Sequence, residues 1–385
     1  MKRELETILS FFIFESLKTN RMAGNTIGKL YTLTSFGESH GKAIGGVVDG
    51  CPAGVRLSIE AIQQELDRRR PGQSDLTTGR NEQDRLEIFS GIWEGVTTGM
   101  PIGFSVHNED QRSEDYDALK EVYRPSHSDY AWLKKYGIRD YRGGGRASAR
   151  EHIARVVGGA IARQVLALQG ISVQGYTSRI GAVCLERDYR ELDLNRVMES
   201  AVGCPDPEVS ETMIRQIQEV KQAKDSVGGI VSCVIRGVPV GVGEPVFDRL
   251  QARLAYYMLS INAAKGFEYG EGFKAASFRG SEHNDSFRGI NGEIHAKTNH
   301  AGGILGGVSS GEDIYFNVAF KPVSTIGLKQ DTVNMRGENV VVEGKGRHDP
   351  CVVPRAIPVV EAMAAMAVLD LMLEGNLLIN FENSL

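Results

Sequence analysis

The sequence predicts a single α+β domain. Stretches that alternate between apolar and polar residues follow one another in hairpin order, while a few long segments carry apolar residues at helical spacing. Strands and helices do not alternate as they do in βαβ proteins, so a purely parallel sheet is not expected. No internal repeat, low-complexity tract or linker divides the 385 residues. These observations favour one intertwined domain over two separate domains.

The first predicted strands are 26–34 and 43–48, and the second of them ends at Asp49-Gly50. Residues 86–106 alternate in polarity and contain turn glycines, which indicates antiparallel strands. The remaining predicted strands lie at 171–184, in a pair within 228–240, and at 314–320. The polar, glycine-rich stretch 280–307 is either a long irregular loop or backbone that lies flat against a planar ligand.

Ser58 is predicted to cap a helix that ends near Arg70, because apolar Ile59, Ile62 and Leu66 fall on one face of it. The other predicted helices span 148–169, 208–224, 248–259 and 354–374. Two of these helices carry packing signals. Gly158-Gly159 in the middle of one helix indicates close approach of a second helix. The helix 354–374 is so apolar that we expect it to be buried.

Residues 139–151 hold four arginines and three consecutive glycines directly before the helix 148–169. Ser148 and Glu151 have the spacing of a capping box, which predicts that the helix begins at Ser148. Glycine lets backbone approach a ligand, arginine supplies paired donors, and a helix N-terminus favours negative charge. The stretch is therefore a candidate anion site. The alternative is a solvated basic turn that only caps a helix.

Two histidines lie in polar loops rather than on apolar faces. His40 follows Ser39 in the glycine-flanked turn 36–41, where an imidazole near backbone donors suits proton transfer, although an incidental surface histidine is an equal alternative. His127 lies in the Pro/Ser/Asp loop 125–130, which favours a functional role.

Two further basic segments are candidates for ligand binding. Arg68-Arg69-Arg70 precede a Pro-Gly stop, where they either complement the helix dipole or clamp an anion. The run Arg347-His348-Asp349 stands beside the apolar helix, where packing alone does not explain it.

Composition limits the class of partner and the compartment. The net charge is −5, which gives no support to a nucleic-acid or membrane partner. The five cysteines show no CxxC spacing, which indicates a reducing compartment and predicts neither a disulfide framework nor a metal site. No apolar run reaches the length of a membrane span. We expect residues 1–21 to be an N-terminal extension outside the fold.

Known nucleotide motifs are absent from the sequence. It contains neither the P-loop pattern nor a G-x-G-x-x-G between a strand and a helix, which disfavours P-loop kinases and Rossmann dehydrogenases. Arginines and histidines on glycine-rich loops suit a substrate with phosphate and carboxylate groups, with histidines as acid–base catalysts. One alternative is an RNA-binding protein that uses the arginine loops, against which the acidic net charge counts. Another is an NADPH-dependent flavin reductase.

Six segments together resemble the chorismate synthase family. They are residues 36–41, 68–72, 125–130, 141–151, 298–311 and 346–361, and they follow the family's order. The resemblance runs from Met22 to about Leu373. It implies a catalytic domain over 22–385, built as a single-domain sandwich with a helical core between antiparallel β-sheets. It also implies a cytoplasmic homotetramer.

The family converts 5-enolpyruvylshikimate 3-phosphate to chorismate and phosphate, the last step of the shikimate pathway, which serves aromatic amino acid biosynthesis. The resemblance therefore implies a lyase that performs a 1,4-trans elimination. It also implies a need for reduced FMN, which is thought to lend an electron that helps to expel phosphate and then to recover it. We see no separate nicotinamide motif. We therefore expect a monofunctional enzyme that obtains reduced flavin from an external reductase, with NADPH needed only indirectly.

The resemblance also assigns residues to roles. His40 would protonate the departing phosphate, with Ser39 beside it. His127 would protonate or stabilise the reduced flavin near N1, and Asp349 would relay the substrate proton through flavin N5. Ser148 would be both a catalytic and an FMN-binding residue. The other implied cofactor-binding residues are Arg69, Arg146, Ala147, Asn262, Ala263, Gly306, Lys321, Pro322, Val323, Ser324, Thr325 and Arg347. Asp75 stands where many relatives have a basic residue, so one anion contact of the family is not expected here, and Arg80 is the candidate to replace it.

Overall fold

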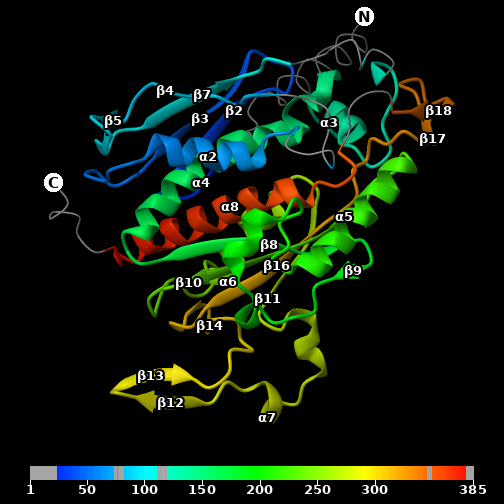
Figure 1. Ribbon diagram of the computed structural model, residues 1–385. Helices are drawn as coiled ribbons and strands as arrows, with labels where there is room; N and C mark the ends of the chain where they lie inside the picture. The colour runs from blue at the N-terminus through cyan, green and yellow to red at the C-terminus, as the bar shows by residue number, and fades with distance from the viewer. Residues whose placement is uncertain are drawn as a thin grey trace, which may run out of the picture.

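The computed structural model describes residues 24–72, 76, 82–110, 116, 119–344 and 349–378. Two five-stranded antiparallel sheets lie on either side of a layer of helices (Figure 1). The first sheet has the order β1 (Thr26–Ile27), β2 (Thr32–Gly37), β3 (Ala43–Asp49), β7 (Ile102–His107), β4 (Leu86–Ile88). The second has the order β11 (Ala264–Tyr269), β16 (Ile314–Phe320), β10 (Gly229–Arg236), β8 (Ser172–Ile180), β9 (Val183–Cys184). The predicted α+β class is confirmed.

Three long helices fill the space between the sheets (Figure 1). They are α2 (Ile59–Arg69), α4 (His152–Ala167) and α8 (Val353–Glu374). Helix α4 packs on β2 and β3 of the first sheet, while α8 packs on β8 and β10 of the second and on α4 between them. A Cβ atom on Gly159 would lie 2.2 Å from the Cα atom of Ala362. The predicted close helix contact at Gly158-Gly159 is therefore confirmed, and it joins the two halves of the core.

The remaining helices lie outside this layer. They are α3 (Asp129–Tyr136), α5 (Pro207–Gln222), α6 (Leu250–Leu259), α7 (Gly280–His283) and the 3₁₀ turns η2 (Arg142–Ala147), η3 (Ala149–Glu151), η4 (Tyr189–Glu191), η5 (Leu194–Glu199) and η6 (Gly272–Ser277). Among the described residues, α8 is the one helix long and apolar enough to cross a membrane, so the expectation that no apolar run reaches that length was wrong. Of its most apolar stretch, 94 % is buried in the fold. Its position in the core accounts for its composition, as predicted.

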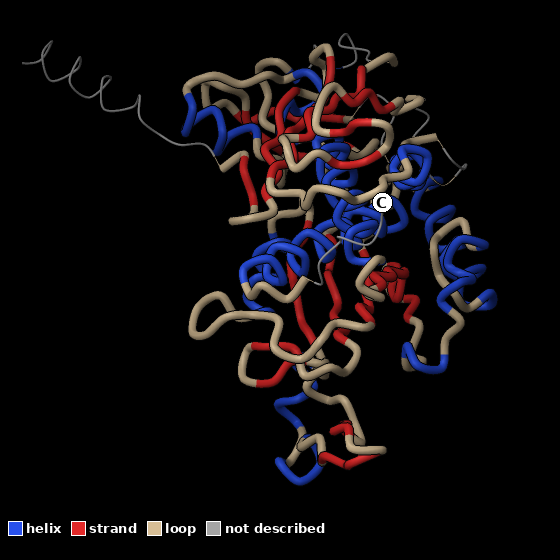
Figure 2. The backbone as a smooth tube through the Cα atoms, turned by 90° about the vertical axis from the view of Figure 1, so that its left-hand side faces the viewer, coloured by secondary structure: helices blue, strands red, loops and turns tan. Residues whose placement is uncertain are grey.

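Short hairpins complete the described chain. They pair β5 (Ile92–Trp93) with β6 (Val96–Thr97), β12 (Phe287–Ile290) with β13 (Glu293–Ala296), β14 (Ile304–Leu305) with β15 (Val308–Ser309), and β17 (Lys329–Val333) with β18 (Asn339–Glu343). The hairpin β12–β13 projects from the body of the molecule (Figure 2). The stretch 280–307 is therefore not one irregular loop, because it contains α7, the β12–β13 hairpin and the strand β14. The expected extension 1–21 lies outside the described residues.

The prediction of one strand over 26–34 was wrong. The chain turns between β1 and β2, because the buried Asp370 carboxylate of α8 accepts hydrogen bonds from the backbone N–H groups of Lys29, Leu30 and Tyr31. A remote side chain thus fixes this turn. The strand pair expected within 228–240 is the single strand β10, which ends before Gly237, a residue in the left-handed region with φ +81°.

The helix expected to begin at Ser148 starts with a 3₁₀ turn instead. Ser148 does cap it, since its hydroxyl accepts from the backbone N–H of Arg150 at 3.3 Å, but α4 itself begins at His152. The Glu151 carboxylate accepts from Arg155 Nε at 2.8 Å. The helix predicted from Ser58, by contrast, is confirmed, because the Ser58 hydroxyl accepts from the backbone N–H of Ala61.

Candidate active site

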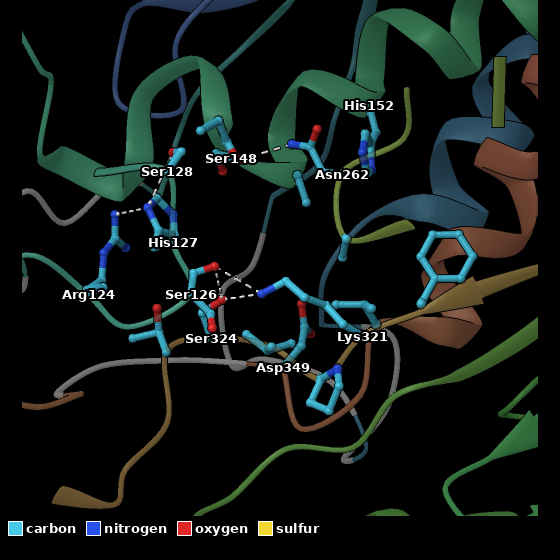
Figure 3. Close-up of a pocket in the computed structure, with 18 of the residues that line it drawn as sticks. Arg124, Ser126, His127, Ser128, Ser148, His152, Asn262, Lys321, Ser324 and Asp349 are labelled. Atoms are coloured by element: carbon cyan, nitrogen blue, oxygen red, sulfur yellow. Dashed lines mark hydrogen bonds between the residues drawn. The ribbon is translucent and has the colours of Figure 1, made fainter. Parts of the chain in front are cut away.

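A cavity of about 410 Å³ lies where segments from across the chain meet (Figure 3). Its lining comes from the end of α2, the loop 124–128, the η2–η3 turn, the start of α4, residues 262–263, residues 320–325 and residues 349–356. The described lining contains four cationic side chains, namely Arg69, Arg124, Lys321 and Arg355. It also contains apolar side chains, among them Phe320, Pro322, Val323 and Val352. This size and this mixed lining suit a small anionic ligand with an apolar part.

His127 contacts a buried ion pair between Asp129 and Arg124. Its Nδ1 lies 3.0 Å from Asp129 Oδ1, and Arg124 donates to both oxygens of that carboxylate, at 2.8 and 2.9 Å. A carboxylate can only accept, so the contact with Asp129 is satisfied when Nδ1 carries the proton, whereas Arg124 Nη2, 3.1 Å from the same nitrogen, can only donate. Since Arg124 Nη2 already donates to Asp129, the contact with the carboxylate favours the proton on Nδ1. The other ring nitrogen, Nε2, then faces the backbone of Gly144, where an added Cβ atom would lie 3.2 Å away.

The same cluster sets the charge of both residues. Burial lowers the pKa of His127 below its usual value, and the positive charges of Arg124 and Lys321 act in the same direction against the opposing effect of Asp129. Burial opposes ionisation of Asp129, but hydrogen bonds from Arg124 and His127 hold the pKa of that carboxyl well below its usual range. The ligand-free site therefore presents a neutral imidazole backed by an ionised carboxylate.

A loop from the second sheet closes the other side of the cavity. Lys321 Nζ donates to the Ser126 carbonyl at 3.1 Å and to the Ser324 hydroxyl at 2.6 Å, and that hydroxyl donates to the same carbonyl at 3.0 Å (Figure 3). Burial lowers the pKa of Lys321, and Lys265 adds to the effect. These bonds place an ammonium group beside the His127 loop.

The glycines of the η2 turn allow a close approach. Gly143 has φ +59°, and a Cβ atom there would lie 2.3 Å from His40 Cδ2 and 2.9 Å from Ser39 Oγ. Gly143 and Tyr116 both line the cavity, and the buried His40 ring meets the Tyr116 ring edge-on at 5.1 Å. His40 and Ser39 thus lie directly behind the described wall of the cavity.

Arg69 belongs to a buried charge network. Its Nη2 donates to Asp84 Oδ2 at 2.5 Å, and Arg150 Nη1 donates to Asp84 Oδ1 at 2.7 Å. Burial lowers the pKa of Arg69 to about 10, although the Asp84 charge opposes this. Burial also opposes ionisation of Asp84, but the two guanidinium groups lower its pKa to about 2. Arg69 is therefore a fixed cation at the cavity wall.

Two further contacts position predicted site residues. Arg355 of α8 donates from Nε to the Arg69 carbonyl at 3.0 Å and from Nη1 to the Asp349 carboxylate. Asn262 Nδ2 donates to the Ala147 carbonyl at 3.1 Å (Figure 3). The start of α8 and the turn after α6 are thus tied to the η2–η3 segment around one cavity.

Most of the site residues predicted from the sequence meet at this cavity. Those that line it are Arg69, His127, Ala147, Ser148, Asn262, Ala263, Lys321, Pro322, Val323, Ser324, Thr325 and Asp349. Two others lie elsewhere. The Arg146 guanidinium donates to acceptors on Asn25, Ser35 and Gly37 and lines a neighbouring cavity. Gly306 lies in the turn between β14 and β15 and is not part of the lining.

Arg347 lies outside the described residues, as do Asp75 and Arg80. Sequence reasoning missed three titratable or charged residues that line the cavity, namely Arg124, His152 and Arg355, and it missed Asp129, which contacts His127 but is not part of the lining. Arg124 and Asp129 stand within three residues of His127, and this proximity was the available signal. His152 and Arg355 lie at the starts of two apolar helices, where a helical pattern gives no sign of a pocket.

Comparison with known proteins supports one family. The family model for chorismate synthase matches residues 31–373. A chorismate synthase of Parabacteroides distasonis is 58 % identical over 349 residues, which cover 91 % of this chain and 98 % of the relative. A chorismate synthase of Christiangramia forsetii is 56 % identical over 354 residues, 92 % of this chain and 99 % of the relative.

A solved structure agrees with these relatives. The crystal structure of a chorismate synthase superimposes with a TM-score of 0.73 at 30 % identity, over 91 % of this chain and 93 % of that one. The chain therefore belongs to the chorismate synthase family of carbon–oxygen lyases, which release phosphate from 5-enolpyruvylshikimate 3-phosphate to form chorismate.

Proposed function

We propose that the described cavity is the place where this reaction occurs, with 5-enolpyruvylshikimate 3-phosphate and reduced FMN bound together. The observation that carries the proposal is the convergence on one cavity of four cations with His127 and Asp349. A fixed cation stabilises a leaving phosphate more strongly in a partly buried site than in water. Arg69, which is 2 % exposed, meets this requirement.

The residues around the cavity fit FMN. Phe320, Val323 and Val352 offer apolar faces for a planar ring, while Lys321 suits its phosphate. Two buried polar atoms of lining residues, Arg69 Nε and His152 Nε2, have no partner among the described residues, which supports a ligand that supplies polar atoms. These residues would hold reduced FMN, whose chemistry would be the supply of a transferable electron.

Most of the proposed FMN-binding residues line the cavity. They are Arg69, Ala147, Ser148, Asn262, Ala263 and Lys321 to Thr325, with Arg146, Gly306 and Arg347 as further proposed contacts.

Three side chains would move protons. We assign protonation of the departing phosphate to His40, with the hydroxyl of Ser39 beside it. The neutral His127 would present Nε2 to the ligand, and an anion placed there would raise its pKa and favour proton uptake. Asp349, held by Arg355, would take the proton that leaves the substrate. Ser148, which lines the cavity, would orient the ligand.

The chain would obtain reduced FMN from an external flavin reductase. NADPH is then needed only by that second enzyme. The alternative is a built-in reductase activity in the same cavity, which the experiment below distinguishes.

We also propose an architecture and a setting for the enzyme. Residues 22–385 would form one sandwich domain, with residues 1–21 outside it, and the shared packing of α4 and α8 between the sheets supports this. Exposed apolar side chains such as Phe247 and Phe273 support assembly, for which we propose a homotetramer. Free cysteines at all five positions support a reducing compartment, the cytoplasm.

Two assays of phosphate release test the function. The first is anaerobic and contains chemically reduced FMN. The second is run in air with oxidised FMN and NADPH. We expect phosphate and chorismate in the first assay only. Product in both assays would establish a built-in reductase, and product in neither would refute the proposed function.

A further inference from the structure

His152 is a buried side chain at the cavity for which the proposed reaction has no role. It is the first residue of α4, lines the cavity and is 7 % exposed (Figure 3). Its Nε2 atom has no hydrogen-bond partner among the residues that the structure describes. The Glu151 carboxylate is 3.8 Å from Nε2, which exceeds hydrogen-bond range. That carboxylate accepts from Arg155 instead, at 2.8 Å.

A second unsatisfied atom belongs to another residue that lines the cavity. Arg69 uses Nη2 for Asp84 and Nη1 for the Ala149 carbonyl, but Nε has no partner in the described part of the chain. A buried donor or acceptor without a partner destabilises the folded state. Two such atoms in residues that line one cavity indicate that a ligand supplies the missing partners.

The charges around His152 specify the kind of ligand. Arg155 on its own helix, Arg69 on α2 and Arg355 on α8 all act on the ring, and Glu151 is the acidic group beside it. Burial lowers the pKa of His152 well below its usual value, and these three arginines lower it further. A neutral imidazole can donate from Nε2, and cations on neighbouring helices attract a negative oxygen to it.

We propose that His152 Nε2 and Arg69 Nε together hydrogen-bond an anionic oxygen of the ligand, carried by a carboxylate or a phosphate. The inference rests on the proposed function and extends it by a residue that selects the ligand. The oxygen comes either from the substrate or from the phosphate of FMN, and separate binding measurements distinguish these two sources.

The test compares two substitutions at one position. His152→Leu removes the polar atom and keeps most of the volume, whereas His152→Gln keeps a donor. His107→Ala, at the exposed end of β7, is the matched control for loss of a histidine outside the cavity. Calorimetric titration of each purified variant measures the dissociation constants of oxidised FMN and of 5-enolpyruvylshikimate 3-phosphate separately.

We expect His152→Leu to lower the affinity for one of the two ligands by about tenfold. The loss of affinity should be smaller in His152→Gln and absent in His107→Ala. Ligand-free His152→Leu should unfold at the same temperature as the wild type or higher, because an unsatisfied buried atom is removed. A purely structural histidine would give a lower unfolding temperature with unchanged affinities. If His152→Leu does not fold, the affinities of His152→Gln are compared with those of the wild type instead, and a loss of affinity for one ligand is expected there too.

The ligand whose affinity falls identifies the source of the oxygen. Loss confined to the substrate assigns the oxygen to the substrate, and loss confined to FMN assigns it to the cofactor phosphate. Unchanged affinity for both ligands in both His152 variants, with the wild type active, would overturn the inference alone. A wild-type chain that binds neither ligand would refute the proposed function instead.

Discussion

Asp129 Oδ1 and His127 Nδ1 lie 3.0 Å apart, inside a cluster in which Arg124 neutralises the carboxylate. Asp129 is 3 % exposed, so this contact is buried. The carboxylate restricts the ring in two ways: it favours the proton on Nδ1, and it fixes which nitrogen faces the cavity. The acid–base role that we propose for His127 would therefore depend on a residue that does not line the cavity.

Replacing Asp129 with Asn should separate orientation from chemistry. An amide can offer Nδ1 either a donor or an acceptor, so the ring loses its fixed tautomer. We expect turnover to fall by about 10- to 100-fold, and by about 100-fold or more in His127→Ala, where the acid–base group itself is lost. Asp129→Asn should also alter the ¹⁵N chemical shifts of the His127 ring.

The control for this substitution is Asp188→Asn. Asp188 pairs with Arg190 at 2.7 Å, but on the surface. The Asp188→Asn substitution should leave both the turnover and the ¹⁵N chemical shifts of the His127 ring unchanged. A wild-type histidine spectrum in Asp129→Asn would contradict the assigned role, even if the activity fell.

Gly143→Ala should displace His40. Any L-residue at φ +59° is strained, and here the new Cβ atom would also overlap the imidazole, 2.3 Å from its Cδ2 atom. Gly137 has φ +77° with no heavy atom within 4 Å of an added Cβ, so Gly137→Ala carries the backbone strain alone. Both variants should lose about 1–2 kcal/mol of stability from that strain. Phosphate release should fall sharply only in Gly143→Ala, and equal activity in the two variants would argue against a role for His40.

The loops of the site could be predicted from sequence, whereas the orientations of their side chains could not. Glycine, arginine and histidine in short polar segments identified the His127 loop and the segment 139–151, because local chemistry marks these segments, whereas Lys321 to Thr325 were assigned only through the family resemblance. The direction of the Arg146 guanidinium depends on three acceptor residues more than a hundred positions earlier in the chain. Arg355 reaches the cavity only because α8 crosses α2, a contact that a helical pattern does not encode.

The predicted boundaries of the first strand were wrong for the same reason. The turn between β1 and β2 depends on Asp370, 339 residues from Tyr31, and alternation of polarity alone cannot reveal it. Where the determinants were local, as at the Ser58 cap, the prediction held.

Arg146→Ala should act on FMN through the backbone. Its guanidinium ties η2 to β2 by donating to the Ser35 hydroxyl at 2.8 Å and to the Gly37 carbonyl at 3.3 Å. Removing it should cost about 1–3 kcal/mol of stability and loosen the Ala147–Ser148 segment that lines the cavity. We expect weaker FMN binding by calorimetry together with a lower unfolding temperature. Weaker binding at unchanged stability would instead indicate a direct contact between Arg146 and FMN.

Asp84→Asn should change how the stability of the enzyme responds to acid. Because Arg69 and Arg150 lower the pKa of Asp84 to about 2, against a usual value near 3.8, the folded state holds this carboxylate ionised more strongly than the unfolded state does. The resulting stabilisation is fully present above about pH 4 and is lost as the pH falls through about 2. A shift of this size corresponds to about 2 kcal/mol.

In Asp84→Asn that pH-dependent part disappears, so the free energy of unfolding should fall less steeply between pH 4 and pH 2 than in the wild type. At neutral pH the variant should be less stable by about 3–5 kcal/mol, because the buried Arg69 charge loses its partner. Denaturant titrations at fixed protein concentration measure both effects, with the exposed Asp331→Asn as the control. Parallel pH profiles for Asp84→Asn and the wild type would show that Asp84 does not stabilise the fold through its charge.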